Sequence, residues 1–185
     1  MHLGVDVGAT RTKLIVWDAD TDAVVARESI ATPVVHGEVE RRDHAAVWSA
    51  LEALAHALPE NLRRSIRGVS VASIGEEIVL LARDGASIVP TPCWYAVEAS
   101  ADGPADPLLS WHHFAFLRRH ASEELRDAAN FTDVGSHVAM RLAGMPAQDA
   151  VMDRSHASRT GLLSTDGEWD ADAIERGGAA GVGSV

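Results

Sequence analysis

The opening of the chain alternates between apolar runs and polar turns, as expected of short β-strands. Residues 3–7 and 13–17 are apolar runs with β-branched side chains, and residues 23–30 form a third run. Residues 8–10 and 18–22 are small or polar and separate these runs as turns. The pattern predicts an antiparallel meander of three strands.

A helical pattern follows the meander. Four apolar residues recur at i, i+4, i+7 and i+11, the spacing of one helical face: Val47, Leu51, Leu54 and Leu58. Asp43 stands where it can cap this helix. Residues 66–73 and 77–82 predict two further strands, and residues 88–94 predict a short extended segment broken by prolines.

The second half of the chain has a helical character. Residues 98–107 are small and polar and predict a loop. Thr132 is a candidate N-cap and Gly144 a candidate helix stop. The predicted helices are residues 108–119, 123–129, 132–143 and 169–176. Strands and a helix followed by further strands and then helices predict an α/β fold with a mixed sheet.

Composition narrows the classes of function. The 185 residues are 46% hydrophobic, enough for a sizeable core. The net charge of -11 argues against nucleic acid as a partner, since phosphate contacts need a basic face. A single cysteine, Cys93, excludes an internal disulfide and fits a reducing cytoplasm. The sequence has no signal-peptide pattern and no apolar run near the ~20 residues that span a bilayer, so we expect a cytoplasmic protein without a membrane partner.

The first turn carries the strongest candidate chemistry. Asp6 ends the first strand, Gly8 opens a tight turn, Thr10 adds a hydroxyl, and Arg11 and Lys13 bring positive charge. A glycine lets backbone N–H groups approach phosphate oxygens. The carboxylate would repel phosphate unless Mg²⁺ lies between them. The alternative is an ordinary hairpin with an incidental aspartate; the turn is not a Walker loop, because no helix follows it.

Several segments resemble a known family. Residues 3–10, LGVDVGAT, resemble the first phosphate motif of the superfamily of sugar kinases, actin and Hsp70 chaperones. Later segments are similar, in the same order, to parts of FGGY carbohydrate kinases: residues 73–85, 90–94, 131–144, 158–161 and 169–170. The resemblance runs from Leu3 to about Gly178, and its specificity lies in the order of the motifs.

The resemblance implies an architecture. FGGY kinases have two lobes with a ribonuclease-H-like core, and their active site lies between the lobes. By resemblance, residues 1–185 are an incomplete, truncated first lobe with a helical insertion at about residues 107–176. The C-terminal lobe that binds the adenosine of ATP is absent from this chain.

The resemblance also implies roles for individual residues. Asp6 would organise Mg²⁺ through water, and Glu76, Glu77 and Trp94 would lie near the sugar. The pair of glutamates is equally compatible with a solvated acidic strand end. The residues that would contact or neutralise the phosphates of ATP are Gly8, Ala9, Thr10, Arg11 and Lys13.

The sequence departs from the family in two respects. Family members usually have Trp-x-Asp-x-Arg where this chain has Ala96 in place of the acid and Glu98 in place of the base. The family's catalytic aspartate lies downstream of this chain's last residue, and Asp153 and Asp170 match structural parts of the insertion instead. Phosphoryl transfer needs such a group to orient the hydroxyl, so we expect the chain alone to be inactive.

Other candidate residues favour structural roles. His112 and His113 are adjacent on a predicted helix, do not share a face, and are interpreted as surface residues rather than metal ligands. Cys93 is interpreted as a buried thiol. Trp94 and Tyr95 could stack on a sugar ring or serve as ordinary core or rim aromatics.

The leading functional hypothesis is ATP-dependent phosphorylation of a sugar or polyol by the full-length protein. A non-catalytic member that binds a sugar or nucleotide is the alternative, motivated by Ala96 and Glu98. Another enzyme of the superfamily, such as an acetate or hexose kinase, is a third reading. The insertion is compatible with homo-oligomer contacts.

Overall fold

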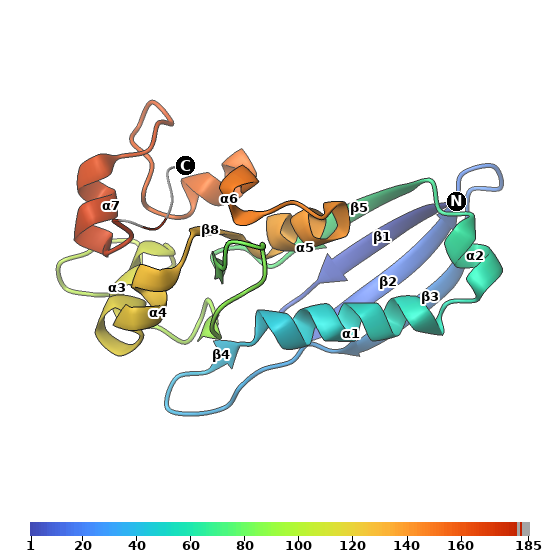
Figure 1. Cartoon of the computed structure of the whole chain (residues 1–185), viewed down its shortest axis with the longest axis horizontal. Coiled ribbons are helices and arrows are strands. Elements are labelled where there is room, and N and C mark those ends of the chain that lie inside the picture. The colour runs from blue at the N-terminus through green and yellow to red at the C-terminus, as the bar shows by residue number, and fades with distance from the viewer. Residues whose placement is uncertain (181, 183–185) are drawn as a thin grey trace. The chain divides into compact units, whose positions relative to one another are not determined.

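The predicted opening meander is confirmed. In the computed structural model, which describes residues 1–180 and 182, β1 (His2–Val7), β2 (Arg11–Asp18) and β3 (Ala23–Ala31) pair antiparallel (Figure 1). β5 (Gly68–Ser73) pairs parallel with β1, which gives the strand order β3-β2-β1-β5. The sheet is therefore mixed, as predicted.

One face of this sheet is covered by α1 (His44–Ala57) (Figure 1). Alternate residues of β1 and β2 are buried, and so is the predicted helical stripe: Leu3, Val5, Val7, Leu14, Val16, Val47, Leu51, Leu54 and Leu58. Buried side chains recur every two residues in the strands and about every 3.6 residues in the helix, and both sets pack into one core. The short α2 (Glu60–Arg64) begins after Pro59 and was not predicted.

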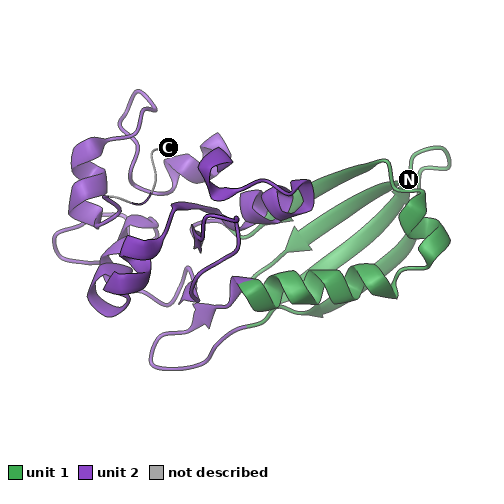
Figure 2. Cartoon of the chain, viewed as in Figure 1, with its two compact units in different colours: residues 1–33, 45–74 green, residues 34–44, 75–185 purple. Residues whose placement is uncertain are grey.

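The chain divides into two compact units (Figure 2). Unit 1 comprises Met1–Pro33 and Ala45–Ile74, and it contains the four-stranded sheet. Unit 2 comprises Val34–His44 and Gly75–Val185.

Unit 2 is built on two short strand pairs and several helices. β6 (Ile78–Leu81) pairs antiparallel with β8 (Asn130–Asp133), and β4 (Arg41–Arg42) pairs antiparallel with β7 (Thr91–Pro92). The helices are α3 (Trp111–His120), α4 (Ser122–Asp127), α5 (Val134–Ala143), η1 (Ala147–Asp149), α6 (Arg154–Ser158) and α7 (Ala171–Gly177). The core includes Ile78, Leu80, Trp111, Phe114, Leu117, Phe131 and Leu162.

The predicted start of one helix is wrong. Thr132 is not an N-cap but a fully buried residue of β8, and the cap of α5 is Asp133, whose Oδ1 accepts the Ser136 N–H at 2.9 Å. A four-residue strand leaves too little alternation to be seen beside a helical pattern. The predicted stop is confirmed, because Gly144 is left-handed with φ 67°.

The prediction that His112 and His113 lie on the surface is also wrong. His112 is fully buried, and its ring accepts the Ser100 N–H at 3.0 Å and lies 3.1 Å from the Asp106 carbonyl oxygen. His113 is 2% exposed. Both ring nitrogens of His112 have partners, as is usual for buried polar groups, whereas Nδ1 of His113 has none among the described residues. In the part of the chain that the structure describes, no helix has the length and apolarity needed to cross a membrane.

Candidate functional site

The candidate residues fall into two groups, one in each unit. In unit 1, the turn between β1 and β2 is closed by a hydrogen bond from the Gly8 N–H to the Arg11 carbonyl at 3.1 Å. The Gly8 carbonyl accepts the Thr32 hydroxyl at 2.8 Å. A Cβ on Gly8 would lie 2.9 Å from the Arg11 carbonyl oxygen, so the close approach requires glycine. The Gly8 N–H is therefore already used by the turn itself.

Thr10 is the exposed residue of the turn. Ala9 is half-buried. The Thr10 carbonyl accepts the Thr32 N–H at 3.0 Å. Neither its N–H nor its hydroxyl has a partner among the residues that the structure describes. Thr10 is the donor of this turn that a ligand can reach most readily.

Charged side chains gather on the outer face of the sheet beside the turn. Asp6 and Lys13 are cross-strand neighbours, and their Oδ2 and Nζ atoms lie 2.9 Å apart with both side chains about half exposed. Arg11 lies on the same face of β2 and donates from Nε to the Ser29 hydroxyl at 2.9 Å. Lys13 holds Oδ2 of Asp6, and Oδ1 has no hydrogen-bond partner among the described residues, so water or a cation can reach it.

This set of groups fits a hydrated Mg²⁺ with phosphates. Mg²⁺ usually keeps several waters and takes one or two carboxylates together with phosphate oxygens. Asp6 supplies one carboxylate oxygen, while Arg11 and Lys13 supply positive charge. Within residues 1–180 and 182, no cluster of three or more His, Cys, Asp or Glu side chains could hold a metal ion by itself. The carboxylate here suits a metal that arrives with its nucleotide.

In unit 2, Glu77 is withdrawn into the protein. Its two oxygens accept hydrogen bonds from Nε and Nη2 of Arg42 at 2.9 and 3.0 Å, and both side chains are 0% exposed. The Trp94 N–H also donates to Oε1 at 3.3 Å. Glu77 is thus not a solvated strand end. Its oxygens accept hydrogen bonds from Arg42 and from the backbone of residues 93–98, called here the Trp94 segment.

The Trp94 segment is fixed from several sides. The Cys93 N–H donates to the Glu40 carbonyl at 2.9 Å, and the Cys93 thiol is buried, as predicted; burial raises its pKa. His113 hydrogen-bonds the backbone of Trp94, although burial lowers the pKa of His113 to about 4. Trp94 and Tyr95 form an edge-to-face pair with ring centroids 5.4 Å apart. These contacts fix the backbone that carries the Trp94 indole.

Glu76 has a different environment from its neighbour. Its φ is 62°, in the left-handed region that non-glycine residues rarely adopt. Oε1 accepts from Nε of Arg159 at 2.9 Å, and the Glu76 carbonyl accepts the Ser110 hydroxyl at 2.6 Å. The side chain is 23% exposed, and Oε2 accepts no hydrogen bond from the described residues. Glu76 thus has a carboxylate oxygen available for a ligand hydroxyl.

Asp153 and Asp170 have structural roles as helix caps. Asp153 caps α6 through the Ser155 N–H at 2.9 Å, and Asp170 caps α7 through two N–H groups at 2.9 and 3.0 Å. The Ala96 N–H closes a turn onto the Cys93 carbonyl at 2.9 Å, and Glu98 is exposed. Sequence reasoning missed Arg42, Ser110 and Arg159, which hold the two glutamates. It also missed Asp106, which holds Arg159, and His113, which holds the Trp94 backbone.

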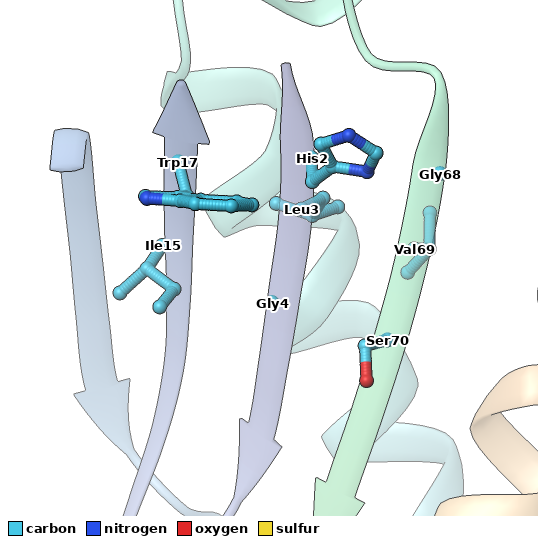
Figure 3. Close-up of a pocket in the computed structure, with 8 residues that line it drawn as sticks. All are labelled: His2, Leu3, Gly4, Ile15, Trp17, Gly68, Val69 and Ser70. Atoms are coloured by element: carbon cyan, nitrogen blue, oxygen red, sulfur yellow. The ribbon is translucent and has the colours of Figure 1, made fainter. Parts of the chain in front are cut away.

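A separate hollow of about 350 Å³ lies on the outer face of the unit 1 sheet (Figure 3). Its lining comes from the first residues of β1, from β2 and from β5: His2, Leu3, Gly4, Ile15, Trp17, Gly68, Val69 and Ser70. The turn of residues 8–10 follows the last residue of β1, so the hollow lies at the other end of that strand. Its mainly apolar lining does not suit phosphate or a polyhydroxylated sugar.

Solved structures with the same fold are carbohydrate kinases. The chain superposes on xylulose kinase from Rhodospirillum rubrum with a TM-score of 0.78 and 21% identity, covering 95% of this chain and 41% of that one. It matches Plasmodium falciparum glycerol kinase with ADP with a TM-score of 0.74 and 14% identity, covering 98% and 42%. The chain has the α/β fold of FGGY carbohydrate kinases, and the resemblance predicted from its motifs is confirmed.

A curated relative agrees with this class. The chain is 20% identical to gluconokinase of Bacillus subtilis strain 168 over 198 aligned residues, which cover 95% of this chain and 38% of that protein. No model of a protein family matches the sequence. The chain spans less than half the length of the kinases that it resembles.

Proposed function

We propose that this chain is the phosphate- and sugar-binding part of an ATP-dependent kinase that phosphorylates a hydroxyl of a sugar or polyol. The observation that carries the proposal is the turn after β1, with Asp6 before it and Lys13 after it, on the fold of FGGY kinases. In this proposal the 185 residues correspond to a first lobe with a helical insertion at about residues 107–176. A second lobe supplies the adenosine site and the catalytic base.

The proposed roles in unit 1 follow from which atoms are open. Asp6 Oδ1 accepts hydrogen bonds from water around Mg²⁺, which when bound neutralises phosphate charge. Thr10 donates its N–H and hydroxyl to phosphate oxygens, and Arg11 and Lys13 offset their charge. Gly8 shapes the turn rather than donating to the ligand, because its N–H is held by Arg11.

The proposed roles in unit 2 differ between the two glutamates. Glu76 accepts a substrate hydroxyl at Oε2, since a carboxylate is an acceptor for several hydroxyl donors. Trp94 offers its ring to an apolar face of the sugar. Glu77 holds the backbone of Trp94 and does not touch the substrate. No residue of the chain is assigned to take the proton of the attacking hydroxyl, so the chain alone binds but does not transfer phosphate.

A titration of the isotope-labelled chain tests the proposal. Mg²⁺ with a non-hydrolysable ATP analogue is expected to shift backbone signals of residues 6–13, and neutral polyols are expected to shift those of Glu76 and Trp94. Asp6→Asn should weaken nucleotide binding about tenfold, the value of one charged hydrogen bond. A nucleotide response that is absent, or that is unchanged in Asp6→Asn, would contradict the phosphate site.

A non-catalytic binding protein is the second candidate, favoured by Ala96 and Glu98 in the Trp94 segment. A protein that contains this chain together with an adenosine-binding lobe separates the two candidates. ADP release with at least one member of a sugar and polyol panel supports the kinase. Binding of both ligands without ADP release supports the alternative.

A further inference from the structure

The backbone of Glu76 adopts a conformation that must be held by its surroundings. Its φ of 62° is one of two positive values at non-glycine residues in the described chain, and the other, Asp22, lies in the polar turn between β2 and β3. Residues in sparsely populated backbone regions persist where neighbours fix them, and they gather at functional sites. The groups that fix Glu76 therefore bear on what its carboxylate does.

Two groups fix Glu76, and they fix each other. The Ser110 hydroxyl donates to the Glu76 carbonyl at 2.6 Å, and the Ser110 N–H donates to the Arg159 carbonyl at 3.1 Å. The Arg159 guanidinium donates from Nε to Glu76 Oε1 at 2.9 Å. The main chain and side chain of Glu76 are thus tied to a helix start and to a residue 83 positions away.

Asp106 holds the other edge of the guanidinium. Its Oδ2 accepts from Nη1 of Arg159 at 3.1 Å, while its Oδ1 accepts the Leu108 N–H at 3.0 Å. The Leu108 N–H and Arg159 together lower the pKa of Asp106, so this carboxylate stays ionised. A planar guanidinium fixed by two carboxylates has a defined orientation, which a lysine ammonium would not have.

We propose that Arg159 is a positioning residue for substrate binding: anchored by Asp106, it holds Glu76 Oε1 and orients Oε2 to accept a hydroxyl of the sugar or polyol. The inference rests on the proposed function for the identity of the ligand. It assigns to Arg159 a role through Glu76, without contact between Arg159 and the substrate.

A double-mutant cycle on the full chain tests the coupling. The variants are Arg159→Ala, Arg159→Lys, Glu76→Gln and the double variant Glu76→Gln/Arg159→Ala, and the probes are D-xylulose, xylitol and glycerol. Arg159→Ala is expected to weaken binding of the tightest probe about tenfold, and Arg159→Lys less, since one charged hydrogen bond contributes about that factor. In the Glu76→Gln background, Arg159→Ala should change affinity less than about twofold.

Controls separate positioning from a loss of structure. Arg126 is an exposed arginine of α4 whose one hydrogen bond among the described residues goes to the Ser122 carbonyl, and Arg126→Ala should leave affinity unchanged. Binding of Mg²⁺ with the ATP analogue should be the same in every variant, because its residues lie in unit 1. Equal losses from Arg159→Ala with and without Glu76→Gln, or no loss at all, would overturn the proposal.

A second measurement needs no ligand. In the free chain, Arg159→Ala should increase the mobility of the Glu76 side chain, measured as a lower NMR order parameter at Cγ, and Arg159→Lys should do so in part. Unchanged mobility of the Glu76 side chain would be enough to overturn the proposed role of Arg159. A chain that binds none of the three probes yet shows the mobility change would contradict the proposed sugar site and leave the role of Arg159 in holding Glu76 intact.

Discussion

The two groups of candidate residues are held in opposite ways. In unit 1, Asp6 and Lys13 form a half-exposed pair between adjacent strands, next to a turn whose Thr10 is open to solvent. In unit 2, Glu77 and Arg42 form a fully buried pair that joins residues 35 positions apart. The first arrangement leaves charge available to a ligand, and the second uses charge to fix the backbone.

The difference shows that neighbouring acidic residues can have separate tasks. Glu76 and Glu77 are adjacent in sequence, yet only Glu76 keeps an oxygen without a partner among the described residues. A buried carboxylate has lost its hydration and needs hydrogen-bond partners within the protein, so its oxygens are not available to a ligand. Substitutions in the two groups should therefore differ in their effect on stability.

Breaking the buried pair should have the largest effect. Arg42→Ala leaves the Glu77 carboxylate buried without its cation, which costs about 3–5 kcal/mol of the free energy of unfolding. Chemical denaturation measures this loss. The matched control is Arg64→Ala, which removes the exposed pair with Glu60 and should cost at most about 1 kcal/mol. Equal costs for the two variants would show that the buried pair has no special role.

Acid should destabilise unit 2 through its buried histidines. Burial lowers the pKa of His44 to about 3 and those of His113 and His137 to about 4, against 6.5 for a free histidine. Below pH 6.5 the unfolded chain therefore binds protons that the folded chain does not. Stability is present in full above pH 6.5 and falls toward pH 4.

Replacing one of these histidines measures how much it contributes to the loss of stability at acid pH. Each contributes about 2 kcal/mol to the loss of stability between pH 7 and pH 5, since a pKa unit corresponds to about 1.4 kcal/mol. His113→Gln should therefore show a smaller drop over this range by about that amount, in unfolding experiments at a series of pH values. His56→Gln is the control, because His56 is an exposed residue of α1 in unit 1. Parallel pH curves for wild type and His113→Gln would contradict the prediction.

Gly8→Ala should distort the turn between β1 and β2. Its Cβ would lie 2.9 Å from the Arg11 carbonyl oxygen, and backbone must move to accept it, at a cost of about 1–3 kcal/mol. Gly75→Ala is the matched control, since a Cβ there meets nothing within 4 Å. That change should alter stability by about 0.5 kcal/mol or less. Thermal unfolding compares the two variants, and similar costs would contradict the requirement for glycine at position 8.

The fold could be predicted where its signals are local. Alternation in β1 and β2, the stripe Val47 to Leu58 and the stop at Gly144 are each visible within one element. The prediction failed for Thr132, because a four-residue strand that pairs with β6 across the sequence looks like the start of the following helix. It also failed for His112 and His113, because their partners in the loop before α3 and in the Trp94 backbone are brought to the two rings only by tertiary structure.

The candidate site also has a part that the sequence could predict and a part that it could not. Asp6, Gly8 and Lys13 lie within eight consecutive residues, so the sequence alone predicts that they belong to one site. The partners of the glutamates are far along the chain: Arg42 lies 35 positions from Glu77, and Arg159 lies 83 positions from Glu76. Although the segment containing Arg159 belongs to the resemblance with FGGY kinases, its contact with Glu76 depends on tertiary structure.

We propose a phosphate site at the turn of unit 1 and a sugar site at Glu76 of unit 2. The most direct test is calorimetric titration of wild type, Asp6→Asn and Glu76→Gln with Mg²⁺ and an ATP analogue, and separately with xylitol. Asp6→Asn should cost at most about 1 kcal/mol of stability, because the pair of Asp6 with Lys13 is half exposed. Thermal unfolding checks that Glu76→Gln, at a side chain that is 23% exposed, is folded. Asp6→Asn should lose nucleotide affinity and keep xylitol affinity, and Glu76→Gln should do the reverse. Nucleotide binding that ignores Asp6 and Mg²⁺, or losses that do not separate between the two variants, would contradict the account.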